Sequence, residues 1–166
     1  MSDAGADRGD RGVPADLWGD QREFYTFSPE SLGQSLPQFE IRGEVGKGSM
    51  GIVYEAVVRA TGQRIALKIL PPSLTLTERA LARFLREGRV MARVQHPDIV
   101  AFHDQGHAGR LHWFAMEFVD GITLQERLRV GPLPIRQAVE IAARVGRALH
   151  YAHARGVVHR DVKPGN

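Results

Sequence analysis

The sequence of 166 residues contains no cysteine, which excludes a disulfide-stapled scaffold, a thiolate zinc site and a cysteine nucleophile. Long hydrophobic runs are also missing, and none approaches the roughly 18 residues that a membrane-spanning helix needs. The N-terminus lacks the basic start and apolar stretch of a secretory signal. We therefore expect a cytoplasmic protein with no membrane segment in this chain.

Lysine is scarce: the sequence contains only three lysines, Lys47, Lys68 and Lys163, compared with 19 arginines. A lysine ammonium is a compact charge and an arginine guanidinium a planar fork, so a position that keeps lysine here indicates a need for the compact charge. Residues 1–37 carry a net charge of −4 and residues 38–166 a net charge of +7. The basic part suits a polyanion such as a nucleotide or nucleic acid, although a solvated basic surface is the simpler explanation of composition alone.

The order of hydrophobic patterns predicts an α+β fold. Residues 1–37 are rich in Gly, Asp, Ser and Pro without periodicity, so we expect a disordered or loosely ordered tail. After it, alternating and β-branched segments predict strands, and amphipathic segments predict helices. The predicted strands are 39–46, 52–58, 64–70, 99–104 and 111–119, and the predicted helices are 77–94, 123–130 and 135–154.

A glycine-rich segment lies between the first two predicted strands. Residues 46–53 read GKGSMGIV, which fits the pattern G-x-G-x-x-G-x-V. A dinucleotide-binding turn would place these glycines between a strand and a helix, whereas IVYEAVV at 52–58 is poor helix material. The pattern therefore favours a hairpin folded over phosphates, whose glycines let backbone N–H groups approach an anion. An ordinary hairpin turn remains the alternative on this motif alone.

Two further groups of polar residues accompany apolar segments. Lys68 lies within the apolar strand RIALKIL and needs an anionic partner, which Glu87 on the predicted helix 77–94 could supply. Each of the two, taken alone, is more simply a surface charge. Residues 159–166 read HRDVKPGN, and a carboxylate, an ammonium and an amide within six residues are suited to accepting a proton, steadying a phosphoryl group and binding a metal.

Together these motifs resemble, in order and spacing, the signature of a protein kinase of the Ser/Thr type, in its bacterial eukaryotic-like (Hanks-type) branch. The resemblance covers residues 38–166 and includes the segment MEFVDG at 116–121 as the hinge. It implies a two-lobe protein-kinase fold, with a small lobe at 38–119 made of a five-stranded antiparallel sheet and one helix. Residues 120–166 would begin a truncated large lobe. The implied ligands are ATP, Mg²⁺ and protein substrates with Ser or Thr hydroxyls.

The resemblance also assigns catalytic roles residue by residue. Lys68 would hold the α- and β-phosphates of ATP, fixed by an ion pair with Glu87. Asp161 would accept the proton of the substrate hydroxyl, and Lys163 would meet the γ-phosphate. Asn166 would bind one magnesium ion. The spacing of Lys163, two residues after Asp161, matches the Ser/Thr pattern.

The remaining nucleotide-binding positions follow from the same resemblance. The glycines would cover the phosphates, three apolar side chains would enclose the adenine, and backbone groups of the hinge would meet the adenine edge beside a residue that guards the deeper pocket. A packed column between the lobes would include Met91, Phe102 and His159. The nucleotide-binding set is Val45, Gly46, Lys47, Gly48, Ser49, Met50, Gly51, Val53, Ala66, Met116, Glu117 and Val119.

The sequence stops at Asn166 without the D-F-G motif and activation segment of the family. We therefore expect a kinase fragment that is inactive alone although its parent is active, with exposed apolar surface on helix 135–154. A non-catalytic nucleotide-binding or partner-binding remnant is the alternative. A dinucleotide-dependent oxidoreductase is disfavoured by the strand after the glycines, and nucleic-acid binding by the lack of interleaved basic and aromatic residues. A dimer through the small lobe is compatible with the resemblance.

Overall fold

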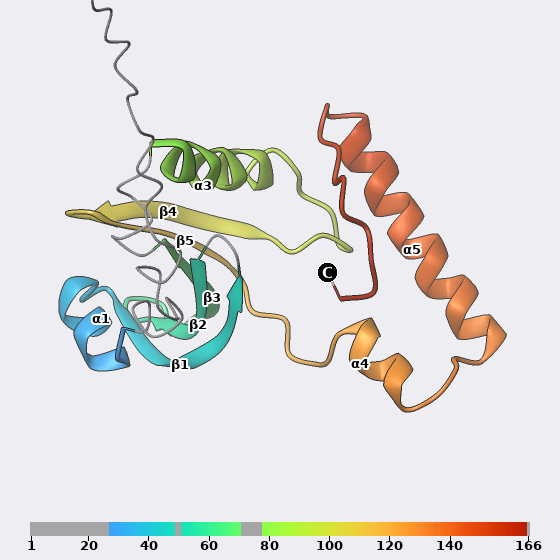
Figure 1. The fold of residues 1–166 in the computed structure, drawn as a ribbon, viewed down its shortest axis with the longest axis horizontal. Coiled ribbons are helices and arrows are strands. Elements are labelled where there is room, and N and C mark those ends of the chain that lie inside the picture. Colours follow the sequence, from blue (N-terminus) through green and yellow to red (C-terminus); the bar gives the residue numbers. More distant parts are fainter. Residues whose placement is uncertain (1–26, 49–50, 71–77, 166) are drawn as a thin grey trace, which may run out of the picture.

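The computed structural model describes residues 27–48, 51–70 and 78–165, and its strands form one five-stranded sheet (Figure 1). Its strand order is β1-β2-β3-β5-β4, and every neighbouring pair is antiparallel. The predicted antiparallel small-lobe sheet is therefore confirmed. The strands are β1 (Phe39–Gly48), β2 (Gly51–Val58), β3 (Arg64–Leu70), β4 (Phe102–Ala108) and β5 (Leu111–Glu117).

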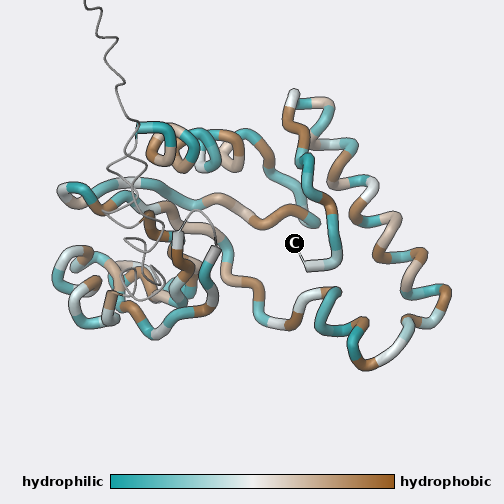
Figure 2. The backbone as a smooth tube through the Cα atoms, in the orientation of Figure 1, coloured by the Kyte–Doolittle hydropathy of each residue, from teal (hydrophilic) through white to brown (hydrophobic). Residues whose placement is uncertain are grey.

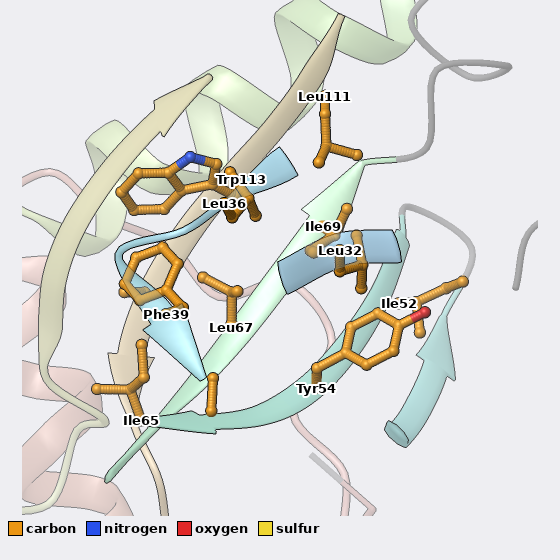
Figure 3. Packing of buried hydrophobic residues seen from close by; sticks show 12 residues of the cluster. Leu32, Leu36, Phe39, Ile52, Tyr54, Ile65, Leu67, Ile69, Leu111 and Trp113 are labelled. Atoms are coloured by element: carbon orange, nitrogen blue, oxygen red, sulfur yellow. The ribbon is translucent and has the colours of Figure 1, made fainter. Parts of the chain in front are cut away.

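The central strand β3 matches its predicted range of 64–70 because its sequence, RIALKIL, suits a strand buried on both faces. Ile65, Leu67 and Ile69 are fully buried. They belong to the larger hydrophobic cluster, which also takes in Phe39 and Trp113, whose rings meet edge to face at 4.9 Å (Figure 3). This cluster fixes the sheet on which the polar residues of the site are mounted.

Strand β4 lies later in the sequence than the predicted 99–104. It continues through Gly106 to Ala108, although glycine is a poor strand former and the residues HAGR suggest a turn. Trp113 on β5 explains the difference, since its ring lies where a β-carbon on Gly106 would be, and the small residue lets the aromatic ring pack over the edge strand. The strand therefore follows from cross-strand packing that local propensity does not report.

Residues 29–35, which composition places in the tail, form helix α1 (Pro29–Ser35). Ser28 caps the helix with its side-chain oxygen, and Pro29 occupies the first turn, as is favoured there. Leu32 and Leu36 lie four residues apart and are each 1% exposed in the larger hydrophobic cluster. The ordered part of the chain therefore begins before Phe39, because two leucines spaced for one helix face complete the core of the sheet.

Helix α3 (Glu78–Met91) agrees with the predicted helix 77–94 and packs on the sheet through a second hydrophobic cluster. Phe84 is buried at its centre, 5.0 Å from the ring of Phe114 on β5. The candidate N-terminal caps Thr75 and Thr77 lie outside the described residues. Among the described helices, α1 contributes to one hydrophobic cluster of the sheet and α3 to the other.

Helices α4 (Leu124–Arg129) and α5 (Ile135–His153) follow the sheet and lie apart from it in Figure 1, as predicted for the start of a second lobe. Thr123 and Glu126 form a capping box at the start of α4. Two contacts tie α5 to the loop before β4: Arg144 Nε donates to Asp98 Oδ1 at 2.6 Å, and the rings of Tyr151 and His96 are 5.1 Å apart.

Helix α5 carries hydrophobic and hydrophilic residues in alternation along its length (Figure 2). Its apolar Ile135 and Val139 are 84% and 61% exposed, which confirms the expected exposed apolar surface. None of the described helices is both long and apolar enough to cross a bilayer.

Candidate active site

The core of the site is an ion pair between β3 and α3. Lys68 Nζ donates to Glu87 Oε1 at 2.6 Å, and the two side chains are 15% and 29% exposed. Strand alternation sends Lys68 to the face opposite Leu67 and Ile69, and there its ammonium lies 5.4 Å from the centroid of the Phe114 ring. The pairing expected from the sequence is therefore present, and it satisfies a lysine that burial would otherwise disfavour as a cation.

The register of the sheet aligns several predicted nucleotide-binding residues with Lys68. Gly46 on β1 pairs with Val53 on β2, Val53 pairs with Lys68, and Lys68 pairs with Phe114 on β5. Directly paired residues share a sheet face. Gly46 of the glycine-rich segment, the apolar Val53 and the ammonium of Lys68 therefore lie on the same face of the sheet.

A second row runs parallel to the first. Ala66 lies two residues before Lys68, so it occupies the same face, and it pairs with Met116. Ala66 is 7% exposed and Val53 is half-buried, whereas Val45 is 55% exposed. The structure thus brings Val53, Ala66 and Met116 together beside Lys68 and leaves Val45 at the rim.

The glycine-rich hairpin joins β1 to β2, with Gly48 paired to Gly51. Gly51 has φ of +135°, and a β-carbon there would collide with the backbone carbonyl of Ile69, so the position requires glycine. Lys47 lies 3.6 Å from the carboxylate of Glu44. The predicted residues Ser49 and Met50 lie outside the described residues.

Residues 159–165 of the HRDVKPGN motif follow α5, and this part of the chain lies between that helix and the sheet in Figure 1. Lys163 Nζ donates to Asp161 Oδ2 at 2.8 Å, and the Asp161 backbone N–H donates to His159 Nδ1 at 3.3 Å. Arg160 has φ of +65°, a conformation that a non-glycine residue adopts at a cost of about 1–3 kcal/mol. Asn166, the predicted magnesium ligand, lies outside the described residues.

The loop is anchored to α4 by a contact that the motifs do not reveal. The backbone N–H of Gln125 donates to the carbonyl oxygen of Pro164 at 2.8 Å, and the Gln125 side chain lies where a β-carbon on Gly165 would be. The end of the HRDVKPGN motif is therefore bound by a backbone N–H of the first turn of α4. Such an N–H has no hydrogen-bond partner within its own helix. The capping pattern at Thr123 is the only sequence signal for this helix start.

The predicted hinge, residues 116–121, begins in the last two residues of β5 and continues beyond it. Glu117 is anchored twice to Ala101, since its backbone N–H donates to the Ala101 carbonyl at 2.8 Å and its Oε2 accepts from the Ala101 N–H at 3.1 Å. Val119 is 63% exposed. The backbone groups predicted to meet adenine therefore lie in a segment fixed at one end to the residue that precedes β4.

The predicted column between the lobes is assembled in part. Met91 and Phe102 pack in the second hydrophobic cluster, around Phe84 and Phe114. His159 is exposed and lies outside that cluster.

Known proteins resemble the chain along the part that holds these features. Residues 39–166 match the family model for the protein kinase domain. The chain is 42% identical over 137 residues to the serine/threonine-protein kinase PknJ of Mycobacterium bovis, which covers 82% of this chain and 23% of PknJ. It is 39% identical to PknA of Mycobacterium tuberculosis, over 78% of this chain and 31% of PknA.

The fold matches solved kinase structures as well. The crystal structure of the Mycobacterium tuberculosis PknI kinase domain superposes with a TM-score of 0.65 and 36% identity, over 78% of this chain and 53% of that domain. The chain therefore spans about a quarter of PknJ and about half of the solved PknI domain. With this agreement of sequence, fold and motif order, the chain belongs to the protein kinase domain family.

Proposed function

We propose that this chain forms the nucleotide-binding and catalytic-loop part of an enzyme that transfers the γ-phosphate of ATP to Ser and Thr hydroxyls of proteins. The observation that carries the proposal is the 2.6 Å contact between Lys68 Nζ and Glu87 Oε1. A kinase needs such a pair because the glutamate on the helix fixes the lysine that holds the α- and β-phosphates.

The chain's own residues have the chemistry for the transfer. Asp161 would accept the hydroxyl proton as the substrate oxygen attacks phosphorus, and its carboxylate lies beside the Lys163 ammonium. That ammonium can neutralise charge on the γ-phosphoryl group as it leaves the β-phosphate oxygen. The Ser/Thr preference is supported by the position of Lys163 and by relatives named serine/threonine-protein kinases.

The described residues of the site include groups that fit the phosphates of ATP, but they do not include a complete set of ligands for magnesium. Gly51 keeps the hairpin free of a β-carbon, and Lys68 supplies a half-buried cation on the same sheet face as Gly46. Magnesium, when bound, would neutralise the β- and γ-phosphates. The described residues do not make up a magnesium site by themselves: no group of three or more His, Cys, Asp or Glu gathers among them, and Asn166 lies outside. We therefore assign no step to the metal.

The testing experiment separates binding from transfer. A fluorescent ATP analogue is titrated into the purified chain and its Lys68→Met variant, with Arg59→Met as a matched control for loss of an exposed cation. We expect Lys68→Met to weaken binding by about tenfold and Arg59→Met to leave it unchanged. Equal affinity of all three proteins would contradict the proposal.

Phosphotransfer is then measured to casein with radiolabelled ATP, using the full-length protein and its Asp161→Asn variant. The expected result is transfer that the substitution abolishes while nucleotide affinity is kept. Nucleotide binding without transfer by the full-length protein would instead favour the non-catalytic alternative.

A further inference from the structure

Arg64, the first residue of β3, connects the sheet to the segment between the two lobes. It lies immediately before Ile65, which pairs with Glu117, the last residue of β5. None of the motifs singles out Arg64, since it stands in a plain turn-and-strand sequence, TGQRIALKIL. Its guanidinium nonetheless contacts three groups on two different elements.

On the sheet side, Arg64 is fixed by a carboxylate of β2. Its Nε donates to Glu55 Oε1 at 2.9 Å, and the Glu55 side chain is 23% exposed. Hydrogen bonding by Arg64 lowers the pKa of Glu55 below its usual value, so this carboxylate stays charged at neutral pH. Arg42 adds a second positive charge at 3.5 Å from the same oxygen.

On the hinge side, the same guanidinium meets two residues of the segment 118–122. Its centre lies 3.9 Å from the centroid of the Phe118 ring, and its terminal nitrogen donates to Asp120 Oδ2 at 3.2 Å. Across the described residues, no other side chain makes a hydrogen bond, ion pair or cation–π contact to this segment. Beyond its anchor at Glu117, the hinge is therefore attached to the sheet through Arg64.

We propose that Arg64 is a positioning residue, which clamps the hinge against the sheet and so sets where the backbone of Glu117 and Val119 meets the adenine. The inference rests on the proposed function, because the hinge matters in this way only if ATP binds there. Arg64 has no assigned role toward ATP or the reacting atoms, and it would act through Phe118 and Asp120.

The clamp requires arginine and not simply a positive charge. A guanidinium is planar, so it can cover the face of Phe118 while its edge donates in two directions, to Glu55 and Asp120. A lysine ammonium is a point charge without a planar fork, so it cannot cover the Phe118 ring and hold both carboxylates in the same geometry. Asp120 is 83% exposed and contributes little by itself, so the ring contact and the bond to Glu55 carry the clamp.

Hydrogen–deuterium exchange of the nucleotide-free chain tests the clamp directly. The variants are Arg64→Ala and Arg64→Lys, and the matched control is Arg59→Ala, an exposed arginine near the end of β2. The reporters are the amides of Glu117 and Ala101, because each donates a hydrogen bond that anchors the hinge next to the clamp. We expect these two amides to exchange about fivefold faster in Arg64→Ala, at least about twofold faster in Arg64→Lys, and at the native rate in Arg59→Ala. Native exchange of these amides in Arg64→Ala would overturn the proposal.

Titration with a fluorescent ATP analogue provides the second readout. Arg64→Ala is expected to raise the Kd about fivefold, with partial recovery in Arg64→Lys. Faster hinge exchange with an unchanged Kd would overturn the positioning role. If the native chain does not bind the analogue at all, the proposed function fails, while the exchange experiment still decides whether Arg64 holds the hinge.

In the full-length protein, the same variants separate positioning from a general loss of structure. A displaced hinge should raise KM for ATP about fivefold. The kcat and the KM for the protein substrate should stay within about twofold of the native values, and the melting temperature within a few degrees. A parallel fall of kcat and melting temperature with KM unchanged would indicate a purely structural residue and contradict the proposal.

Discussion

The ammonium of Lys68 on β3 lies 2.6 Å from the carboxylate of Glu87 on α3, a contact that joins the centre of the sheet to the helix packed on its second cluster. The pair bridges 19 residues of sequence, and both side chains are largely shielded from water. The ion pair therefore depends on the packing of α3 against the sheet. The same packing fixes the position of the Lys68 ammonium, which the phosphates of a nucleotide would meet.

Removal of Glu87 tests this dependence. In Glu87→Ala the Lys68 ammonium loses its partner in a half-buried position, so it should move and bind phosphates poorly. We expect affinity for an ATP analogue to fall by about tenfold. The matched control is Glu78→Ala, which removes an exposed carboxylate from the first turn of the same helix. Equal losses in both variants would show that only the charge of α3 matters.

Gly51 should be intolerant of a side chain. Its φ of +135° disfavours any L-residue, and a β-carbon would meet the Ile69 carbonyl, so Gly51→Ala should destabilise the hairpin by at least about 1–3 kcal/mol. Gly43→Ala on β1 is the control, because a β-carbon there would meet no neighbouring group within 4 Å and the φ of Gly43 is not positive. Denaturant unfolding measures both, and equal stabilities would contradict the explanation.

Helix α1 should contribute to the stability of the sheet. Leu32→Ala opens a cavity beside Tyr54 and Ile69 in the larger hydrophobic cluster, which should cost about 2–5 kcal/mol of unfolding free energy. Gln34→Ala, at an exposed position of the same helix, should change stability by less than about 0.5 kcal/mol. If Leu32→Ala were as mild as Gln34→Ala, α1 would not be part of the core in solution.

Acidification should weaken the β4–β5 hairpin through His112. Burial, and secondly the charge of His107 at a ring distance of 5.5 Å, lower the pKa of His112 below its usual value. The folded chain therefore binds this proton less readily than the unfolded chain, in which histidine titrates near about 6.5. The stabilising contribution is complete above that value and is lost as the pH falls through the lower pKa of the folded state.

Melting temperatures between about pH 8 and pH 5 measure this effect. His112→Gln should flatten the decline below about pH 6.5, whereas His153→Gln, at an exposed position of α5, should leave it as in the native chain. A decline of the same size in His112→Gln would assign the pH dependence to other groups.

The sequence predicts most of the fold wherever one segment carries a complete signal. RIALKIL is apolar and β-branched over most of its length, and β3 has the predicted bounds. The predicted helix 123–130 is close to α4, and the structure shows that a capping box of Thr123 with Glu126 sets the start of this helix. The residues alone offer Glu87 only as a possible partner of Lys68, and the resemblance to protein kinases makes the ion pair an expectation, which the 2.6 Å contact confirms.

Other features depend on partners distant in sequence. Leu32 forms part of the core only because the sheet leaves that face open, and Gly106 extends β4 only because Trp113 packs over it. The sequence around Arg64 gives no sign of its contacts, because Glu55, Phe118 and Asp120 come together around it only in the folded chain. Their spatial relations are not encoded in any local pattern.

The most direct test of the central claim uses the scarcity of lysine. An acyl-phosphate derivative of ATP transfers its acyl group to a nearby lysine amine, forming an amide and releasing ATP, and the chain offers only Lys47, Lys68 and Lys163. Mass spectrometry of the labelled chain identifies the modified residues. If the site binds ATP as proposed, Lys68 or Lys163, the two lysines assigned to the phosphates, is acylated, and an excess of free ATP prevents this acylation. Acylation of these lysines that free ATP does not reduce, or acylation of Lys47 alone, would contradict the proposal.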